Sequence, residues 1–397
     1  MKYELVNEIR KRALSDKAPV LGGRCTKLKK ICFDDLVFVP AQLCKAPVDY
    51  YREKIETKTI IGKTSKKPIT LETPIFVAAM SFGALSKEAK IVLAKASALT
   101  GTATNTGEGG MLPEERKYAK ILISQYSTAR FGVDEDYLKM GDAVEIKIGQ
   151  GAKPGQGGLL PKEKVTNEIM KVRKITKKED LHSPPKHPDI NNLSDLKKKV
   201  SWLKKLTGGK PVIIKLGAGD VEKDVRIAVK ANPDAIAIDG IAGGTGAAPE
   251  IMLQEFGIPI LSAITKARKT MDMMHAKQEL LVGGGFNTGG DMAKALALGA
   301  DAVFLGFPLL IAMGCIYCQQ CYKGRCPQGI TTQDPKLRKK VNIPEYTKRV
   351  TNYIKSCTEE IKMAAAATGN RNIHNLSPED LRSLNETASK ITGIKMV

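Results

Sequence analysis

The chain has 397 residues, and its 63 Lys and Arg against 42 Asp and Glu give a formal net charge of +21. Hydrophobic residues make up 42% of the chain, which excludes an intrinsically disordered protein and suffices for a large buried core. The N-terminal sequence MKYELVNEIRKR contains no apolar signal-peptide region, and the longest uncharged apolar run, 302–317, is shorter than a membrane span of roughly 18 residues. We therefore expect a cytoplasmic protein without a membrane anchor.

The positive charge raises the hypothesis of a nucleic-acid-binding protein. The Lys and Arg residues are, however, spread along the chain in short runs such as 197–199 and 204–205, and aromatic residues make up only 5%. No zinc-finger, RNP or helix-turn-helix pattern occurs. A solvated lysine-rich surface, or the binding of small anions, is favoured over a nucleic-acid partner.

Short apolar runs alternate with amphipathic helical patterns from about residue 74 to residue 305. The expected strands are 75–79, 103–105, 121–125, 143–148, 212–216, 235–239, 280–283 and 302–305. The expected helices include 87–99, 193–206, 220–231 and 288–298. Seven or eight apolar strands separated by helices predict a parallel (β/α)8 TIM barrel of the α/β class. An open doubly wound sheet is the alternative, although the chain has no G-x-G-x-x-G dinucleotide fingerprint.

We divide the chain into four parts. An N-terminal arm, 1–70, would pack on the barrel, 71–312, and a cysteine-rich loop, 313–335, would precede a helical C-terminal extension, 336–397. The segment 149–188 is rich in Gly, Pro and Lys and follows a strand end. Long loops at strand ends are where barrels carry their chemistry.

Glycine-rich stretches follow several of the expected strands. After the last two strands, Gly284, Gly285 and Gly306 would let backbone amides approach the phosphate of a nucleotide, with help from the dipole of the helix that follows. The clusters 240–249 and 105–110 lack Walker spacing and are interpreted as loops around a flat cofactor. Ordinary βα turns are the alternative interpretation.

Two lysines, Lys147 and Lys215, lie within apolar strands. Burying an ammonium group is costly unless it meets an anion, so both side chains are expected to point into the barrel mouth. The alternative is that each side chain reaches the surface along its aliphatic part.

Four of the eight cysteines form the run Cys315-x2-Cys318-x2-Cys321-x4-Cys326-Pro327. This run differs by one residue from the C-x2-C-x2-C-x3-C-P spacing of bacterial iron–sulfur ligands. Zinc is the competing metal, but structural zinc usually takes two separated cysteine pairs. An iron–sulfur cluster is favoured.

Several strings of the chain resemble the flavin-binding synthase domain of glutamate synthase, above all its archaeal type. The similar strings are 80–86, 105–110, 130–132, 146–155, 183–185, 243–247 and 332–335, within a region of about 30–340. The resemblance implies a (β/α)8 barrel that binds FMN beside an iron–sulfur cluster held by a C-x5-C-x4-C spacing.

In the family this spacing, matched by Cys315, Cys321 and Cys326, binds a [3Fe–4S] cluster. Cys318 is an addition that could hold a fourth iron, and we favour [4Fe–4S], with [3Fe–4S] as the alternative. Against this, Cys318 would lie on the same helical turn as Cys315 and Cys321 and could point away into packing.

The resemblance also implies roles for individual residues. Around the keto acid it places Glu108, Lys147, Lys153 and Arg173. On the cofactor side it implies Met80, Ser81, Asn105, Thr106, Gln150, Lys215, Asp239, Gly243, Gly244, Gly246, Gly284, Gly285, Gly306 and Phe307. Basic groups suit a substrate with two carboxylates, because they donate charge-assisted hydrogen bonds.

The implied reaction condenses ammonia or an amine with 2-oxoglutarate or a related keto acid, and reduced FMN delivers a hydride to the imine. Leu159 and Gln156 stand where the large bacterial form has glutamine and glutamate, which changes the polar contacts available to the keto acid. A glutaminase or amine-supplying subunit and a ferredoxin-like or NAD(P)H-oxidising electron donor are expected as partners, within an oligomer. The alternatives are an electron-transfer or scaffold subunit, or a subunit that makes N-substituted glutamate.

Overall fold

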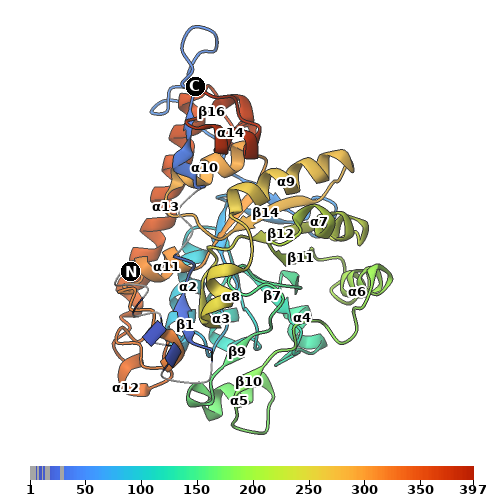
Figure 1. Ribbon diagram of the computed structural model, residues 1–397, viewed down its shortest axis with the longest axis vertical. Coiled ribbons are helices and arrows are strands. Elements are labelled where there is room, and N and C mark those ends of the chain that lie inside the picture. The colour runs from blue at the N-terminus through green and yellow to red at the C-terminus, as the bar shows by residue number, and fades with distance from the viewer. Residues whose placement is uncertain (1–5, 7–8, 11, 14–17, 27–30) are drawn as a thin grey trace.

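The computed structural model describes residues 6, 9–10, 12–13, 18–26 and 31–397. Its centre is a sheet of eight parallel strands in the order β5-β15-β14-β12-β11-β8-β7-β6 (Figure 1). The strands are β5 (Ile75–Val77), β6 (Ala103–Asn105), β7 (Ile121–Tyr126), β8 (Ala143–Lys147), β11 (Val212–Gly217), β12 (Ala235–Asp239), β14 (Glu279–Gly283) and β15 (Ala302–Leu305). All eight expected strands are present, three with the predicted ends and five with one end shifted by one or two residues.

The order of the strands follows the chain around a ring, and β15 returns to pair with β5. Between the two ends of the hydrogen-bonded ladder, β5 and β6, the Thr102 hydroxyl donates to the Ile75 carbonyl at 2.5 Å. The predicted barrel is therefore confirmed, and the open doubly wound sheet is wrong.

Alternation along the strands decides which side chains fill the barrel. On β11, Ile213 packs inside, whereas Val212 and Ile214 face the helices. Because side chains alternate with a period of two, Lys215 is directed inward like Ile213. On β8 the same parity places Lys147 on the inner face with Ala143. The barrel interior is thus apolar at the amino ends of the strands and charged at their carboxyl ends.

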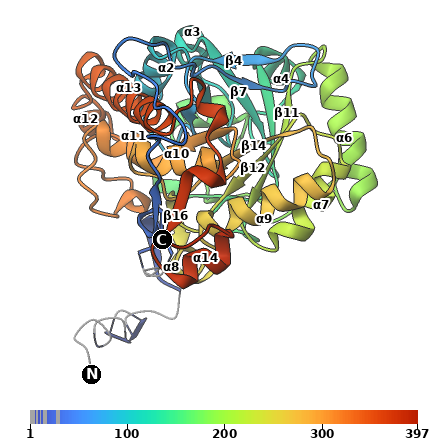
Figure 2. The same ribbon diagram turned by 90° about the horizontal axis from the view of Figure 1, so that it is seen from above.

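Helices surround the barrel (Figures 1 and 2). Those between the barrel strands are α2 (Lys87–Leu99), α3 (Pro113–Tyr118), α4 (Glu135–Met140), α6 (Leu193–Leu206), α7 (Val221–Lys230), α9 (Ile260–Met273) and α10 (Gly289–Ala297). The eighth position is filled by the long helix α13 (Ile343–Ala367), which packs against α2 and α10. The C-terminal part therefore completes the helical layer of the barrel.

The segment 149–188 is folded rather than irregular. Its elements are β9 (Leu159–Leu160), a 3-10 turn η2 (Lys162–Lys164), α5 (Asn167–Arg173) and β10 (Leu181–His182). β9 pairs antiparallel with β10, and the segment encloses a small apolar cluster that includes Phe82, Leu112 and Ile169. This cluster fixes the segment over the carboxyl ends of β5 to β8.

Two short strand pairings and one hairpin tie the N-terminal part to the rest. β1 (Val20–Gly23) pairs with β13 (Thr245–Pro249), and β2 (Leu36–Phe38) pairs with β16 (Leu381–Ser383). The hairpin of β3 (Thr59–Ile61) and β4 (Ile69–Leu71) packs its apolar side chains into the barrel interior.

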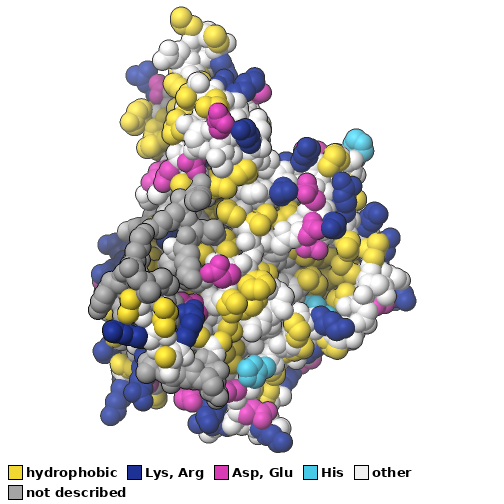
Figure 3. Space-filling model, viewed as in Figure 1, with side chains coloured by type: hydrophobic (Ala, Val, Ile, Leu, Met, Phe, Trp, Pro, Cys, Tyr) yellow, Lys and Arg dark blue, Asp and Glu magenta, His cyan; other side chains and the backbone are white. Residues whose placement is uncertain are grey.

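The remaining elements are short. They are η1 (Phe33–Asp35), α8 (Glu250–Glu255), α11 (Phe307–Ala312), η3 (Cys321–Lys323), α12 (Pro335–Arg338), η4 (Ile373–Asn375), η5 (Pro378–Asp380) and α14 (Glu386–Thr392). Within the described ranges, no helix is both long and apolar enough to cross a membrane. On the face shown in Figure 3, Lys and Arg side chains are dispersed among acidic ones.

Candidate active site

A cavity opens at the carboxyl ends of the barrel strands, where the βα loops, the segment 149–188 and the cysteine loop meet. Its walls include every site residue predicted from the sequence except Asn105 and Thr106. Gln125, Leu159 and Ser183 also line it. The residues expected around a keto acid, a flavin and a metal cluster therefore share one cavity.

The charged end of the cavity is built around Glu108, from the loop after β6. Lys147 Nζ lies 3.0 Å from Glu108 Oε2, and the Ser183 hydroxyl donates to the other carboxylate oxygen. Burial is the largest single influence and would raise the pKa of Glu108, but the charge of Lys147, the hydrogen bonds from Ser183 and Lys147 and the charge of Arg173 together outweigh it and lower this pKa to about 2. Glu108 is therefore a carboxylate at all ordinary pH values.

Two further cations lie close to this pair, and no carboxylate of the described residues is in direct contact with either. Lys153 Nζ donates to the Ala247 carbonyl at 2.8 Å, and burial, together with the charge of Lys147, lowers the Lys153 pKa to about 7. Arg173 donates through Nη2 to the Phe82 carbonyl at 2.9 Å, while its buried Nε has no hydrogen-bond partner. Both side chains are almost fully buried. They are suited to bind an anion that enters the cavity.

Lys215 forms a second ion pair beside the first. Its Nζ lies 3.7 Å from Asp239 Oδ2 on the neighbouring strand β12 and 4.7 Å from the centre of the Phe304 ring. The prediction that Lys147 and Lys215 face the barrel mouth is borne out by their place in the cavity wall. The alternative, that they reach the outer surface, is wrong.

Asn105 and Thr106 lie below the cavity wall. Asn105 Oδ1 accepts from the Gly107 amide at 2.9 Å, and the Thr106 hydroxyl lies 2.8 Å from the Tyr137 hydroxyl. Both residues support the loop that carries Glu108. They do not line the cavity, so their positions favour a supporting role over direct contact with a cofactor.

Lys90 was not recognised from the sequence. It is buried on α2, pairs with Glu115 at 2.7 Å and donates to the carbonyls of Met80, Asn105 and Thr106. It thereby fixes the carboxyl ends of β5 and β6 together. The sequence feature that could have indicated this role is a lysine within the apolar run AKIVLAKA.

His187 was also missed. Its Nε2 lies 2.8 Å from the Lys147 carbonyl and its Nδ1 lies 2.6 Å from Arg130 Nη1. A guanidinium only donates, so Nδ1 accepts and Nε2–H donates to the carbonyl. Burial and the charge of Arg130 lower the His187 pKa to about 4, consistent with a neutral ring. The side chain thereby fixes the backbone of Lys147.

The glycine loops leave room for a cofactor. A Cβ added at Gly306 would lie 3.7 Å from Met80 Sδ, and one at Gly246 would lie 3.8 Å from Ala84, so a side chain at either position of the cavity wall would make ordinary contacts and no clash. Gly284 is different, because its φ is +91° and an added Cβ would lie 2.6 Å from the Gly240 carbonyl oxygen. These glycines fit a flat ring system with a phosphate near the ends of β14 and β15.

The expectation that the helix after β14 contributes its N-terminus to the phosphate site needs correction. The Gly289 amide donates to Glu360 Oε2 at 2.6 Å, and the Asp291 amide donates to the Thr288 hydroxyl at 3.2 Å. Asp291 also accepts from the amides of Asn287 and Thr288. The first turn of α10 is thus occupied by side chains of the protein itself.

The cysteine loop forms one wall of the cavity, and all four thiols border it. Cys326 is buried, Cys315 and Cys321 are partly buried, and Cys318 is exposed. The notion that Cys318 shares a helical turn with Cys315 and Cys321 is wrong, because Tyr317 and Gln319 adopt positive φ and no helix forms there.

Four thiols along twelve residues, beside the buried Lys164 ammonium, suit a thiolate-bound cluster in their chemistry. In the described part of the chain, however, no three Cys, His, Asp or Glu side chains lie close enough together to hold a metal ion. The donor set therefore fits a cluster, while the thiols as placed do not form its coordination shell.

Residues 25–371 match the family model described as the conserved region in glutamate synthase. The chain belongs to the glutamate synthase family. It is 40% identical to the archaeal glutamate synthase [NADPH] of Archaeoglobus fulgidus, over 99% of this chain and 82% of that protein. It is 38% identical to a glutamate synthase large subunit-like protein of Rhizobium meliloti, over 98% of this chain and 92% of that protein. The family predicted from the sequence is confirmed.

Among solved structures, the chain is similar to a mutant flavocytochrome b2 with benzoylformate, with a TM-score of 0.57 and 18% identity over 90% of this chain and 78% of that one. It is also similar to a mutant of an active chimera of (S)-mandelate dehydrogenase, with a TM-score of 0.58 and 15% identity over 88% of both chains. At this level of identity the similarity concerns the barrel fold.

Proposed function

We propose that this glutamate synthase family member is an FMN- and iron–sulfur-dependent oxidoreductase of the cytoplasm. It would reduce the imine formed from 2-oxoglutarate, or a related keto acid, and ammonia or an amine to an amino acid. Electrons would come from a ferredoxin-like or NAD(P)H-oxidising partner. Family membership supports the enzyme class, since the relatives are named glutamate synthase [NADPH].

The observation that carries the proposal is the pair of cations Lys153 and Arg173. Both are buried in the cavity, and neither is in direct contact with a carboxylate among the described residues. Keeping two cations buried is costly, and a dicarboxylate substrate would supply the missing anions. Lys147 and Glu108, which are already paired, would orient the keto group and hold or release a proton there.

FMN would lie between the Met80–Ser81 strand end and the loops of Gly243, Gly246 and Gly306. Gly246 and Gly306 line the cavity and are free of tight contacts with the protein, which supports this position. When bound and reduced, FMN supplies the hydride. Lys215, Gln150 and Asp239 would contact the ring from the barrel side, since all three line the cavity.

An iron–sulfur cluster would bind to Cys315, Cys321 and Cys326, with Cys318 as the fourth ligand of a [4Fe–4S] form. Its support is the donor set along one cavity wall. Binding would require the thiols to turn toward a common centre. A [3Fe–4S] cluster held by three of them is the alternative.

A second candidate product is an N-substituted amino acid. Leu159, Leu160 and Leu181 line the same cavity, and they would pack against an alkyl group carried by the amine. A pure electron-transfer or scaffold subunit is less well supported, because a relay of electrons has no use for buried cations at a closed cavity end.

The proposal is tested by anaerobic mixing of the photoreduced protein with pairs of keto acids and amines. We expect flavin absorbance to return only when both reactants are present, with one amino acid formed per flavin reoxidised. Arg173→Met should abolish this reaction, whereas Arg52→Met, at an exposed site, should not. Reduced flavin that stays reduced with every pair, or protein that takes up no flavin, would refute the proposal.

A further inference from the structure

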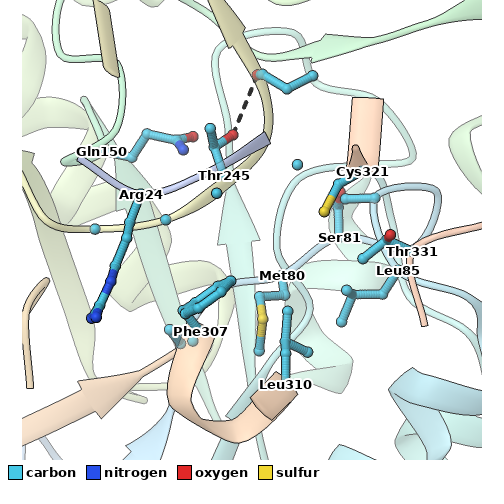
Figure 4. Close-up of a pocket in the computed structure, with 18 of the residues that line it drawn as sticks. Arg24, Met80, Ser81, Leu85, Gln150, Thr245, Phe307, Leu310, Cys321 and Thr331 are labelled. Carbon is cyan, nitrogen blue, oxygen red and sulfur yellow. Dashed lines mark hydrogen bonds between the residues drawn. The ribbon is translucent and has the colours of Figure 1, made fainter. Parts of the chain in front are cut away.

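Arg24 follows strand β1 and reaches the cavity at the end where β14 and β15 finish. It lines the cavity together with Gly284, Gly285 and Phe307. Its Nη1 donates to Asn287 Oδ1 at 2.9 Å, and its Cζ lies 5.7 Å from the centre of the Phe307 ring. Figure 4 shows Arg24 extending past Phe307 on the side of the pocket opposite Cys321 and Thr331. The sequence patterns offered no reason to select it.

The other cations that line the cavity have different neighbours. Lys147 pairs with Glu108, and Lys215 pairs with Asp239. Lys153 and Arg173 lie near Glu108, and Lys164 lies near two of the cysteine thiols. Arg24 is thus the cavity-lining cation that lies beside the late-strand glycines. No Asp or Glu pairs with it among residues whose structure is described.

A phosphate at this end of the cavity needs a positive charge that backbone amides do not provide. The first turn of α10 is poorly placed to supply one, because its Gly289 amide already donates to Glu360 and its Asp291 amide to the Thr288 hydroxyl. Asn287, which holds Arg24, is neutral. A guanidinium presents several N–H donors in a plane and binds phosphate with two of them at once. Arg24 has the chemistry that the glycine loops lack.

Strand β1 is held firmly enough to position this side chain. It pairs with β13, and the Gly22 amide donates to the Gln319 carbonyl of the cysteine loop at 3.1 Å. A Cβ at Gly22 would lie 2.9 Å from Cys321 Cβ, so the strand is packed directly against that loop. At Gly23 the backbone turns with a φ of +115°, which directs the chain toward Phe307.

We propose that Arg24 binds the phosphate group of FMN, so that the N-terminal strand completes the cofactor site of the barrel. This inference rests on the proposed function, because it requires a flavin in the cavity. It assigns the charge that balances the phosphate to a segment outside the barrel. Phe307 would hold the guanidinium in place through its ring face.

The test compares FMN with riboflavin, which has the same ring but no phosphate. Flavin-free protein that retains its other groups is prepared without oxygen, and flavin fluorescence is titrated for the wild type, Arg24→Met, Arg24→Lys and Arg52→Met. We expect Arg24→Met to weaken FMN binding by about tenfold to 100-fold, the effect of losing a charged hydrogen bond. Riboflavin binding should stay unchanged, and Arg24→Lys should give an intermediate FMN affinity. Arg52→Met removes an exposed charge of the same arm and should bind FMN like the wild type.

Each other outcome is informative. Equal loss of FMN and riboflavin binding in Arg24→Met would show a structural role and overturn the inference. Unchanged FMN affinity in Arg24→Met would also overturn the inference, as would a wild type that binds riboflavin as tightly as FMN. In both cases the protein would still have a flavin site. A wild type that binds neither compound would refute the proposed function itself. If Arg24→Met does not fold, as judged by circular dichroism, the Arg24→Lys comparison decides.

Discussion

Lys147 and Lys215 occupy the same register on the neighbouring parallel strands β8 and β11, and both point into the barrel. Each has its own carboxylate, since Glu108 pairs with Lys147 and Asp239 pairs with Lys215. Two ammonium groups side by side would repel each other without these partners. The two pairs therefore depend on a loop residue after β6 and on the end of β12, which flank the two lysine strands on opposite sides.

The first prediction concerns the pair of Lys147 and Glu108. If Lys147 served only to bind the keto acid, as the resemblance implies, replacing it with Met should barely affect stability. The structure changes this expectation, because Lys147→Met leaves Glu108 buried without its main partner. We expect a loss of about 3 kcal/mol in the free energy of unfolding at pH 7, measured by denaturant titration. The double variant Lys147→Met/Glu108→Gln should recover most of it, and a single variant as stable as the wild type would contradict the assignment.

The same pair predicts an acid limb of stability. The folded-state pKa of Glu108 is about 2, below its ordinary value of 4.5. A carboxyl group with a lowered pKa stabilises the fold above pH 4.5, and its contribution is lost as the pH falls from 4.5 toward 2. We expect about 3 kcal/mol of the pH dependence to disappear in Glu108→Gln. Unfolding curves at several pH values in this range would show whether the two proteins differ.

Lys153 predicts a basic limb of activity. Its pKa is about 7 in the folded state, against an ordinary value of 10.5. The unfolded chain therefore binds more protons between pH 7 and 10.5, so the fold gains stability as the pH rises through this window. If the Lys153 cation binds the keto acid, kcat/KM should fall as the pH rises above about 7. In Lys153→Met we expect a lower kcat/KM that no longer falls above about pH 7. A variant whose pH profile matches that of the wild type would contradict this role of Lys153.

Two glycines separate cofactor binding from folding. Gly306 lines the cavity and an added Cβ would clash with no protein atom, so Gly306→Ala should leave the melting temperature nearly unchanged while weakening flavin binding. Gly284→Ala should instead lower the melting temperature, because the added Cβ meets the Gly240 carbonyl oxygen and φ is positive. Flavin titration and thermal unfolding of both variants check this contrast. Equal flavin affinity in Gly306→Ala and the wild type would place the ring elsewhere.

The cluster prediction turns on Cys318. If a [4Fe–4S] cluster forms with four thiolates, Cys318→Ala should yield protein with less iron per chain and a new EPR signal of an oxidised three-iron cluster. Cys321→Ala should lose most of its iron. A wild type that already shows the three-iron signal, unaltered in Cys318→Ala, would mean that the fourth thiol is not a ligand.

The parts of the site that could be predicted from the sequence are those governed by local periodicity. Lys147 and Lys215 lie within apolar strand patterns, and the cost of burying an ammonium group without an anion was enough to predict that both point into the barrel mouth. Arg24, Lys90 and His187 escaped detection because their roles arise from contacts with segments far away in the chain. Lys90, for example, donates hydrogen bonds to carbonyls at two strand ends, and no local sequence pattern predicts these contacts. The helical interpretation around Cys318 failed for the opposite reason, since two residues there adopt left-handed backbone conformations.

The position of α13 has a consequence for how the molecule assembles. This helix supplies the eighth member of the helical layer, yet it follows the cysteine loop in the chain. The contact between α2 and α13 closes a span of about 250 residues, and such distant contacts form late and slowly. During synthesis, β5 and α2 must therefore wait for a neighbour that emerges only after the cysteines. We therefore expect the loop wall of the cavity and the closure of the helical ring to form together, late in folding.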